Sequence, residues 1–274
     1  MNRYEAAFSK VSARGETAFI PFAVAGDPNK DIFIDIIDAY IKGGADVLEI
    51  GFPFSDPVAD GPVNQRASQR AIKSGLNHSL FFSLIKKIRS KTDIPIGVML
   101  YANTIIHLGA DEFCKRAANA GVDSLLVADM PPEESHELGL SMRKHGIGRV
   151  FIASELASDE RMCYICKHVD SFVYVVSRPG ITGIDTTLSA SVKTTINRLK
   201  KITDKPLAVG FGISTPEHVH EVSKAGAHGV IVGSALVIEI EKAVLSGANP
   251  SVILEKKVSL FKAATAFCLC GKDK

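Results

Sequence analysis

The sequence is poor in cysteine and has no strong excess of charge of either sign. Its 274 residues include five irregularly spaced cysteines, and the formal net charge is +2. An odd, uneven set of cysteines gives no disulfide framework, so we expect a reducing compartment. Because no long run of lysine and arginine occurs, composition gives no basis for a nucleic acid partner or an anionic membrane surface. A small anionic ligand remains compatible with this balance, because a few local donors suffice to bind it.

The sequence also lacks a segment that would direct it to a membrane. The N-terminus has no apolar core of a signal peptide, and the longest apolar region, Gly229–Ile240, is too short to span a bilayer. These absences predict a soluble, cytoplasmic protein with no membrane partner. The Cys163–Cys166 pair has no second pair to complete four metal ligands, and His218 and His220 fall on different faces of an expected helix. We therefore predict no metal site.

Short β-rich segments alternate with longer helical patterns along the whole chain. The expected strands are 18–23, 46–50, 96–100, 124–128, 149–153, 171–176, 207–209 and 229–232. Helices are expected between them at 31–42, 80–90, 110–120, 133–144, 159–168, 189–201, 216–225 and 234–245, and a further helix at 250–267.

This alternation predicts a parallel sheet, because strands joined through helices run in the same direction. Eight such units in about 250 residues are typical of a closed (β/α)8 TIM barrel. We therefore expect an α/β fold, with one domain over residues 1–274 and an extra C-terminal helix. The alternative is an open, doubly wound sheet. That fold normally has a GxGxxG first turn, whereas the first turn here reads Ala25-Gly-Asp-Pro28.

One carboxylate interrupts an apolar strand. Glu49 follows Leu48 and precedes Ile50, and alternation along the strand places its side chain on the opposite face from both. If those two pack against helices, Glu49 points into the barrel at the carboxyl end of its strand, where barrel enzymes have their active sites. Burial raises a carboxyl pKa, which suits general acid–base catalysis; the alternative is a glutamate held by a structural ion pair. Asp60, in the following loop, is a weaker candidate.

The same alternation collects mostly apolar and aromatic side chains near the mouth of the barrel. They are Phe22, Met99, Tyr101, Leu126, Ala128, Ile152, Tyr174 and Phe211. Such a cavity suits a flat hydrophobic ligand, although each residue alone can equally be a filler of the barrel. Tyr101 and Tyr174 are the stronger candidates, because a buried phenol usually has a polar partner.

Three loops on the far side of the expected barrel are rich in glycine. They are Ser177–Gly183, Gly210–Ile213 and Gly233–Ser234, and the last opens a helix. Glycine lets backbone amides approach a ligand closely, and a helix N-terminus favours an anion. Together these loops predict a phosphate site, at the position where barrels often have one.

Several segments resemble the family of tryptophan synthase α subunits, in order and over almost the whole chain. The most distinctive is Leu48–Pro62, and the others are 21–28, 101–103, 127–131, 177–183, 210–212 and 233–235. The resemblance implies a single barrel that cleaves indole-3-glycerol phosphate into indole and glyceraldehyde 3-phosphate by retro-aldol chemistry.

The resemblance also implies roles for individual residues. Glu49 would be the acid–base catalyst, Asp60 would stabilise positive charge on the indole nitrogen, and Tyr174 would be the active-site tyrosine. The substrate-binding residues would be Phe22, Tyr101, Leu126, Ala128, Ile152, Thr182, Gly183, Phe211, Gly212, Gly233 and Ser234. Asn64 departs from the family, which usually has an apolar residue there; Pro179 and the tail Cys268–Lys274 are further departures.

Members of that family pair with a pyridoxal-phosphate-dependent β subunit. The resemblance therefore implies an αββα heterotetramer, a loop 53–62 that touches the partner, a lid over Arg178–Ala190, and no cofactor in this chain. Two rival hypotheses remain. One is a barrel retained mainly as an allosteric partner with slow chemistry. The other is a different phosphate-binding barrel enzyme, such as a sugar-phosphate epimerase, although those commonly use metal ligands or another acid–base pair.

Overall fold

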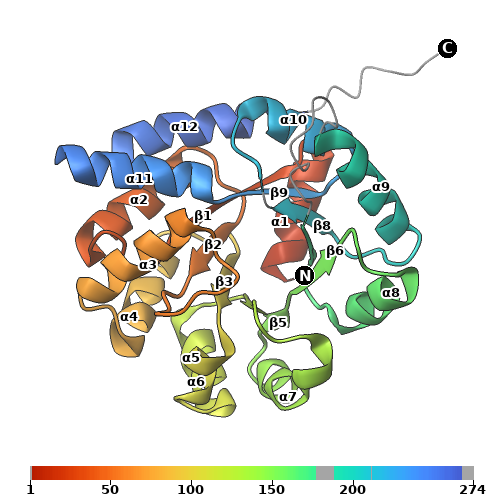
Figure 1. The fold of residues 1–274 in the computed structure, drawn as a ribbon, viewed down its shortest axis with the longest axis horizontal. Coiled ribbons are helices and arrows are strands. Elements are labelled where there is room, and N and C mark those ends of the chain that lie inside the picture. Colours follow the sequence, from red (N-terminus) through yellow and green to blue (C-terminus); the bar gives the residue numbers. More distant parts are fainter. Residues whose placement is uncertain (1, 177–187, 211, 267–274) are drawn as a thin grey trace.

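A computed structural model describes residues 2–176, 188–210 and 212–266, in which parallel strands form a ring surrounded by helices (Figure 1). The strands are β1 (Ala18–Val24), β2 (Leu48–Gly51), β3 (Ile96–Leu100), β4 (Ser124–Val127), β5 (Gly148–Arg149), β6 (Phe151–Ser154), β7 (Val173–Val176), β8 (Leu207–Gly210) and β9 (Gly229–Val232). The helices are α1 (Arg3–Ala13), α2 (Lys30–Lys42), α3 (Pro62–Lys73), α4 (His78–Arg89), α5 (Ala102–Ile106), α6 (Ala110–Ala120), a 3-10 turn (Pro132–Glu134), α7 (His136–Lys144), α8 (Asp159–His168), α9 (Leu188–Lys200), α10 (Pro216–Lys224), α11 (Ser234–Ser246) and α12 (Ser251–Ala263).

The strand order is β5-β4-β3-β2-β1-β9-β8-β7-β6, and neighbouring strands are parallel. The two end strands, β5 and β6, are separated only by Val150, whose N–H donates to the Leu125 carbonyl at 3.0 Å. They are the two halves of the expected fifth strand: the first half pairs with β4 and the second with β7. The ring therefore closes along one broken strand. This confirms the α/β TIM-barrel prediction and excludes the open sheet.

The core has two layers, as the alternation along the strands predicts. Leu48 and Ile50 are fully buried in the layer between the strands and the surrounding helices, together with Phe33 and Phe81. A second cluster fills the inside of the barrel; its members in the strands or directly beside them include Ile20, Val47, Leu126, Val150 and Ile231. Val47 and its neighbour Leu48 thus belong to different layers, which confirms the expected facing of β2.

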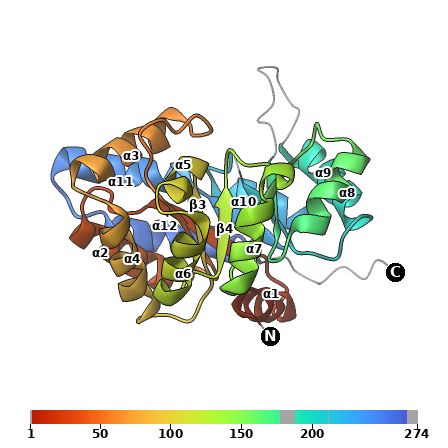
Figure 2. The same cartoon turned by 90° about the horizontal axis from the view of Figure 1, so that it is seen from below.

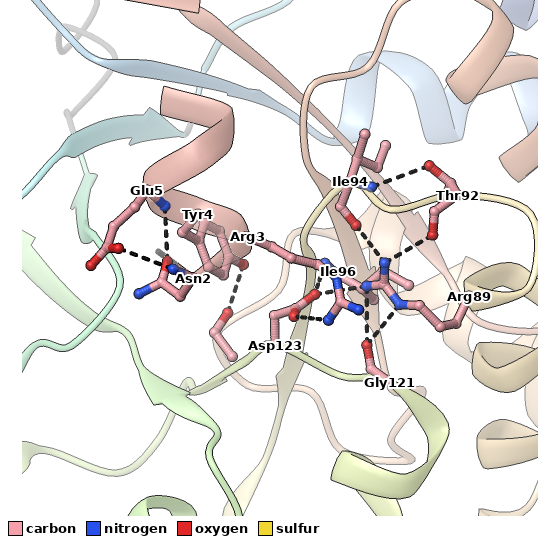
Figure 3. A network of polar contacts seen from close by, with 11 residues as sticks. Asn2, Arg3, Tyr4, Glu5, Arg89, Thr92, Ile94, Ile96, Gly121 and Asp123 are labelled. Carbon is pink, nitrogen blue, oxygen red and sulfur yellow. Dashed lines mark hydrogen bonds and ion pairs between the residues drawn. The ribbon is translucent and has the colours of Figure 1, made fainter. Parts of the chain in front are cut away.

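Helix α1 closes the amino-terminal end of the barrel and was not expected from the sequence. Its Tyr4 hydroxyl lies 2.7 Å from the Ser124 hydroxyl inside the barrel, and Arg3 forms an ion pair with Asp123 at 2.9 Å (Figure 3). Asn2 caps the helix in a capping box with Glu5, a pattern that the sequence does contain. Figure 2 shows α1 below the barrel, away from α3 and α5.

Two other helices, α3 and α5, were also not expected. Helix α3 buries Ala67, Ser68 and Ala71, whose small side chains give a weak apolar period. Helix α5 has only five residues. The extra C-terminal helix is α12; it packs so closely on the end of α2 that a Cβ at Gly43 would lie 2.6 Å from Val258 Cγ1. Within the described residues, no helix has both the length and the apolar character needed to cross a membrane.

Candidate active site

A cavity of about 400 Å³ opens at the carboxyl ends of the strands. The residues of its wall that the sequence analysis predicted near the mouth or for the site are Phe22, Glu49, Asp60, Met99, Leu126, Ile152, Tyr174, Gly212, Gly233 and Ser234. They come from six strands, from the loop between β2 and α3, and from the segments that follow β8 and β9. The fold thus gathers residues that are up to 212 positions apart in the sequence.

Glu49 points from β2 into this cavity and is only 5% exposed. Its strand neighbours in register are Phe22 and Gly97, neither of which offers a charge. Within the described residues, no hydrogen bond to its carboxyl group is formed. Burial, and secondarily the negative charge of Asp60, raises the pKa of Glu49 to about 8. Both its protonated and its ionised form are therefore accessible near neutral pH.

Asp60 approaches the same cavity from the loop between β2 and α3. The Tyr101 hydroxyl donates to its Oδ2 at 3.0 Å, and Asn64 Nδ2 donates to its Oδ1 at 3.3 Å. Gln65 Nε2 donates to its backbone carbonyl at 2.9 Å and so holds the loop against α3. Burial raises the pKa of Asp60, whereas the hydrogen bonds from Tyr101 and Asn64 oppose that rise because they stabilise the ionised form.

Tyr174 lies on β7 and reaches across β8. A Cβ at Gly210 would be only 2.3 Å from the Tyr174 hydroxyl oxygen, so the ring takes this position because residue 210 is a glycine. Burial, followed by the negative charges of Glu49 and Asp60, raises the pKa of Tyr174 well above its ordinary value. The phenol therefore stays neutral and is available as a hydrogen-bond donor beside the two carboxyl groups.

The middle of the cavity is apolar. Phe22 is buried, and its ring fills the space beside Gly51, where a Cβ would lie 2.7 Å from Phe22 Cζ. Leu126 and Ile231 from the inner cluster and the half-buried Met99 complete this part of the wall. The same cavity is lined by Glu49 and Asp60, so a flat aromatic ligand bound there can place a polar edge against a carboxyl group.

The part of the wall formed by the segments that follow β8 and β9 has backbone amides in place of cationic side chains. Gly233 is the N-cap residue of α11 without a side-chain cap, and Ser234 begins the helix. The first amides of a helix have no acceptor within it, and they lie at the positive end of the helix dipole. Gly212 has a φ of +77°, which favours glycine. Because no lysine or arginine lies among the described wall residues, these amides are the groups suited to an anion.

Some predicted residues take other positions. Tyr101 is buried but points at Asp60 from outside the wall, because β3 ends at Leu100 and Tyr101 is the N-cap residue of α5. Ala128 follows β4 and packs on the inner cluster without lining the cavity. Thr182, Gly183, Phe211 and most of the expected lid 178–190 lie outside the described residues.

The wall residues that were not predicted individually for the site are Ala59, Gly61, Pro62, Val63, Val176, Ile213 and Ile231. The strand alternation places Ile231 and Val176 on the inward face, so both could have been predicted. Val63 lies on α3, a helix that was not expected from the sequence. Asn64, noted only as a departure from the family, also lies on the wall. Among the described residues, no group of three histidine, cysteine, aspartate or glutamate side chains is arranged to hold a metal ion.

Comparisons with known proteins agree with this geometry. A family model described as tryptophan synthase alpha chain matches residues 8–266. Two relatives of that name, from Methanoregula boonei and Aliivibrio fischeri, are 46% and 44% identical to this chain; the matches cover 96% and 97% of this chain and 98% and 99% of theirs. The crystal structure of tryptophan synthase subunit alpha from Legionella pneumophila has a TM-score of 0.88 and 34% identity, and covers 97% of this chain and 98% of that chain.

Proposed function

The chain belongs to the tryptophan synthase alpha chain family, and we propose that Glu49 is the acid–base residue with which it cleaves indole-3-glycerol phosphate. The enzyme is a lyase of tryptophan biosynthesis. The observation that supports the role of Glu49 is its burial on the cavity wall without a cation, which raises its pKa to about 8.

The reaction breaks the bond between the indole ring carbon and the glycerol side chain. Protonated Glu49 donates a proton to that ring carbon, which makes the ring nitrogen an iminium. The Glu49 carboxylate then accepts the proton of the adjacent side-chain hydroxyl. As the carbon–carbon bond breaks, its electrons return to the ring, indole regains aromaticity, and the hydroxyl becomes the aldehyde of glyceraldehyde 3-phosphate. A pKa near the working pH suits both transfers, which contribute about 10²–10⁴ in rate.

Asp60 stabilises the positive charge that develops on the ring nitrogen. It does so while ionised, and the hydrogen bonds from Tyr101 and Asn64 favour that form. Tyr174, as a neutral phenol, donates a hydrogen bond to a substrate oxygen near Glu49. Two carboxyl groups in one cavity thus take different protonation states, because only Asp60 receives donors from the described residues.

The rest of the cavity orients the substrate. We propose that the indole ring lies against Phe22, Leu126 and Ile152, and that the phosphate binds the amides at Gly212, Gly233 and Ser234. Thr182, Gly183 and Phe211 stay predictions for the same two subsites. Holding both ends of a substrate in reactive geometry supplies much of the remaining rate enhancement.

The finer assignments concern partners and cofactors. We propose that indole passes to a pyridoxal-phosphate-dependent β subunit in an αββα heterotetramer, that this chain needs no cofactor, and that the complex is cytoplasmic. The loop 53–62, which presents Asp60, would then also contact the β subunit. Size measurement of the isolated chain mixed with purified β subunit tests the stoichiometry, and an absence of any larger species would contradict it.

The decisive experiment on the reaction replaces Glu49 by glutamine, which keeps the size and removes the titrating group. We expect indole release from indole-3-glycerol phosphate to fall by about 10²–10⁴ while substrate binding is kept, with and without added β subunit. Glu255→Gln, an exposed glutamate on α12, is the control and should keep wild-type activity. Full activity of Glu49→Gln would remove Glu49 from the mechanism, and a wild-type rate that is negligible without the β subunit would favour the allosteric role.

A further inference from the structure

Asn64 holds a buried polar atom that has no partner. Among the residues that the structure describes, its Oδ1 is the one side-chain nitrogen or oxygen atom that has almost no exposed surface of its own and also has no hydrogen bond. Asn64 is the third residue of α3 and lies on the wall of the active-site cavity beside Asp60. A buried polar atom without a partner is rare in folded proteins and calls for an explanation.

The orientation of this amide follows from its neighbour. Nδ2 donates to Asp60 Oδ1 at 3.3 Å, and the other oxygen of Asp60 accepts from the Tyr101 hydroxyl. The reversed amide would place two acceptor oxygens against each other, so Asp60 selects the orientation in which Asn64 Oδ1 points away from it. The amide therefore holds Asp60 with one atom and leaves an acceptor beside it with the other.

We propose that Asn64 Oδ1 accepts a hydrogen bond from the bound ligand, and that Asn64 thereby acts as a specificity residue of this cavity. The matching ligand is an indole-type ring with an N–H or O–H group on the edge that faces Asp60. The donor is either the ring N–H itself or a polar substituent on the benzo ring. This inference rests on the proposed function only in taking the ligand to be an indole derivative.

The size of the effect follows from the cost of an unsatisfied buried acceptor. A ligand that supplies the donor removes this cost, whereas a purely apolar edge retains it. The expected difference in dissociation constant is about 5- to 150-fold. Replacing Asn64 by leucine, which has a similar shape and no polar atom, should abolish this preference.

The test measures binding by calorimetry, so that it does not depend on cleavage. The ligands are indole-3-propyl phosphate, which lacks the hydroxyl needed for the reaction, its N1-methyl derivative, and its four derivatives with one hydroxyl on the benzo ring. The proteins are wild type, Asn64→Leu, Asn64→Ala and Tyr101→Phe. Tyr101→Phe removes a donor to Asp60 but leaves the Asn64 acceptor, so it separates effects that act through Asp60 alone. Gln69→Met, an exposed amide on the same helix, is the control.

Two results support the proposal and identify the donor. If the ring N–H is the donor, Asn64→Leu weakens binding of the parent ligand at least fivefold more than Tyr101→Phe does. Binding of the N1-methyl derivative is then unaffected by Asn64→Leu. If a ring substituent is the donor, one hydroxylated ligand binds wild type more tightly than the parent, and both Asn64 variants lose that advantage.

An equal effect of Asn64→Leu and Tyr101→Phe on the parent ligand, with no preference for a hydroxylated ligand, overturns the proposal. So does an equal weakening of all ligands, the N1-methyl derivative included. Because none of these ligands is cleaved, a failure here leaves the lyase assignment intact. Conversely, an inactive enzyme can still show the Asn64 preference.

Discussion

The two ends of the barrel differ in whether their buried or half-buried charged side chains have partners. At the amino-terminal end, the half-buried Arg89 donates to the Asp123 carboxylate at 2.7 Å and to three backbone carbonyls, while Arg3 provides a second cation for the same carboxylate (Figure 3). At the mouth, Glu49 has no hydrogen-bond partner among the described residues. The structural charges at the amino-terminal end are thus paired, whereas the acid that we propose as the catalyst has no partner among the described residues.

The same contrast appears between the half-buried Glu16 and the buried Glu49. Glu16, at the amino-terminal end, accepts from Lys262 at 2.8 Å, and Lys262 also bonds Asp46 at 2.7 Å. Burial alone would raise the pKa of Glu16, but Lys262 and Arg14 lower it overall. Glu49 experiences burial without a cation, and its pKa rises to about 8. A nearby cation, rather than the type of acid, decides the sign of the shift.

The largest expected effect is the pH dependence that Glu49 imposes on stability. Because its pKa is raised from 4.5 to about 8 by folding, the cost of an ionised Glu49 is absent below pH 4.5 and grows as the pH rises to about 8. Relative to Glu49→Gln, wild type should lose up to about 5 kcal/mol of unfolding free energy between pH 4.5 and 9. Urea unfolding at several pH values measures this, with Glu255→Gln as control. If the unfolding free energies of wild type and Glu49→Gln changed in parallel with pH, folding would not raise the pKa of Glu49.

The pairing at the amino-terminal end is tested by Arg89→Met, which leaves Arg3 as the one cation paired with Asp123 among the described residues and removes the side-chain donor to three backbone carbonyls. We expect a loss of about 3–5 kcal/mol in unfolding free energy, with the cleavage rate of the folded enzyme retained. The control is Arg116→Met, which breaks an exposed pair with Glu112 and should cost about 0.5 kcal/mol or less. Equal losses in the two variants would mean that the pairing at the amino-terminal end contributes little.

Asp60→Asn removes a charge from the mouth while keeping the shape of the side chain. If Asp60 stabilises charge that develops on the ring nitrogen, as we propose, cleavage should fall about 10²-fold with little change in unfolding free energy. Steady-state kinetics and thermal melts measure the two effects. Asp56→Asn, an exposed aspartate of the same loop, should leave both unchanged. A rate loss in both variants would indicate a general effect of the loop.

Much of the fold was predictable because barrel strands are short, apolar and separated by helices. The alternation in β2 was enough to place Glu49 inside and Leu48 outside, since a strand has only two faces. The break of the fifth strand at Val150 was not predictable, because it depends on which neighbour each half follows in the closed ring. Helix α3 was missed because its buried face consists of small side chains such as Ala67 and Ala71.

The direction of a site side chain was predictable on a strand, because alternation leaves only two faces. It was less predictable for side chains that belong to a loop or to a helix that was not expected. Tyr101 was expected on the wall, but the chain turns into α5 directly after β3 and aims its hydroxyl at Asp60. The contact between Asn64 and Asp60 requires α3, because Asn64 lies in its first turn and Asp60 two residues before the helix begins. Sequence spacing alone does not contain that geometry.

The smallest expected effect concerns the partial pairing of Asp60. Tyr101→Phe removes one donor to the carboxylate but keeps the ring that stacks on Phe54. Loss of that donor raises the pKa of Asp60, so activity on the acid side should begin to fall at a higher pH than in wild type. Near neutral pH we expect about a tenfold loss in kcat/KM, the value of one hydrogen bond to a charged group. The control is Tyr164→Phe, an exposed tyrosine on α8. If Tyr101→Phe leaves the acid side of the pH–rate profile unmoved, Asp60 owes its ionisation to other groups, and the hydrogen bond from Tyr101 is not what distinguishes Asp60 from Glu49.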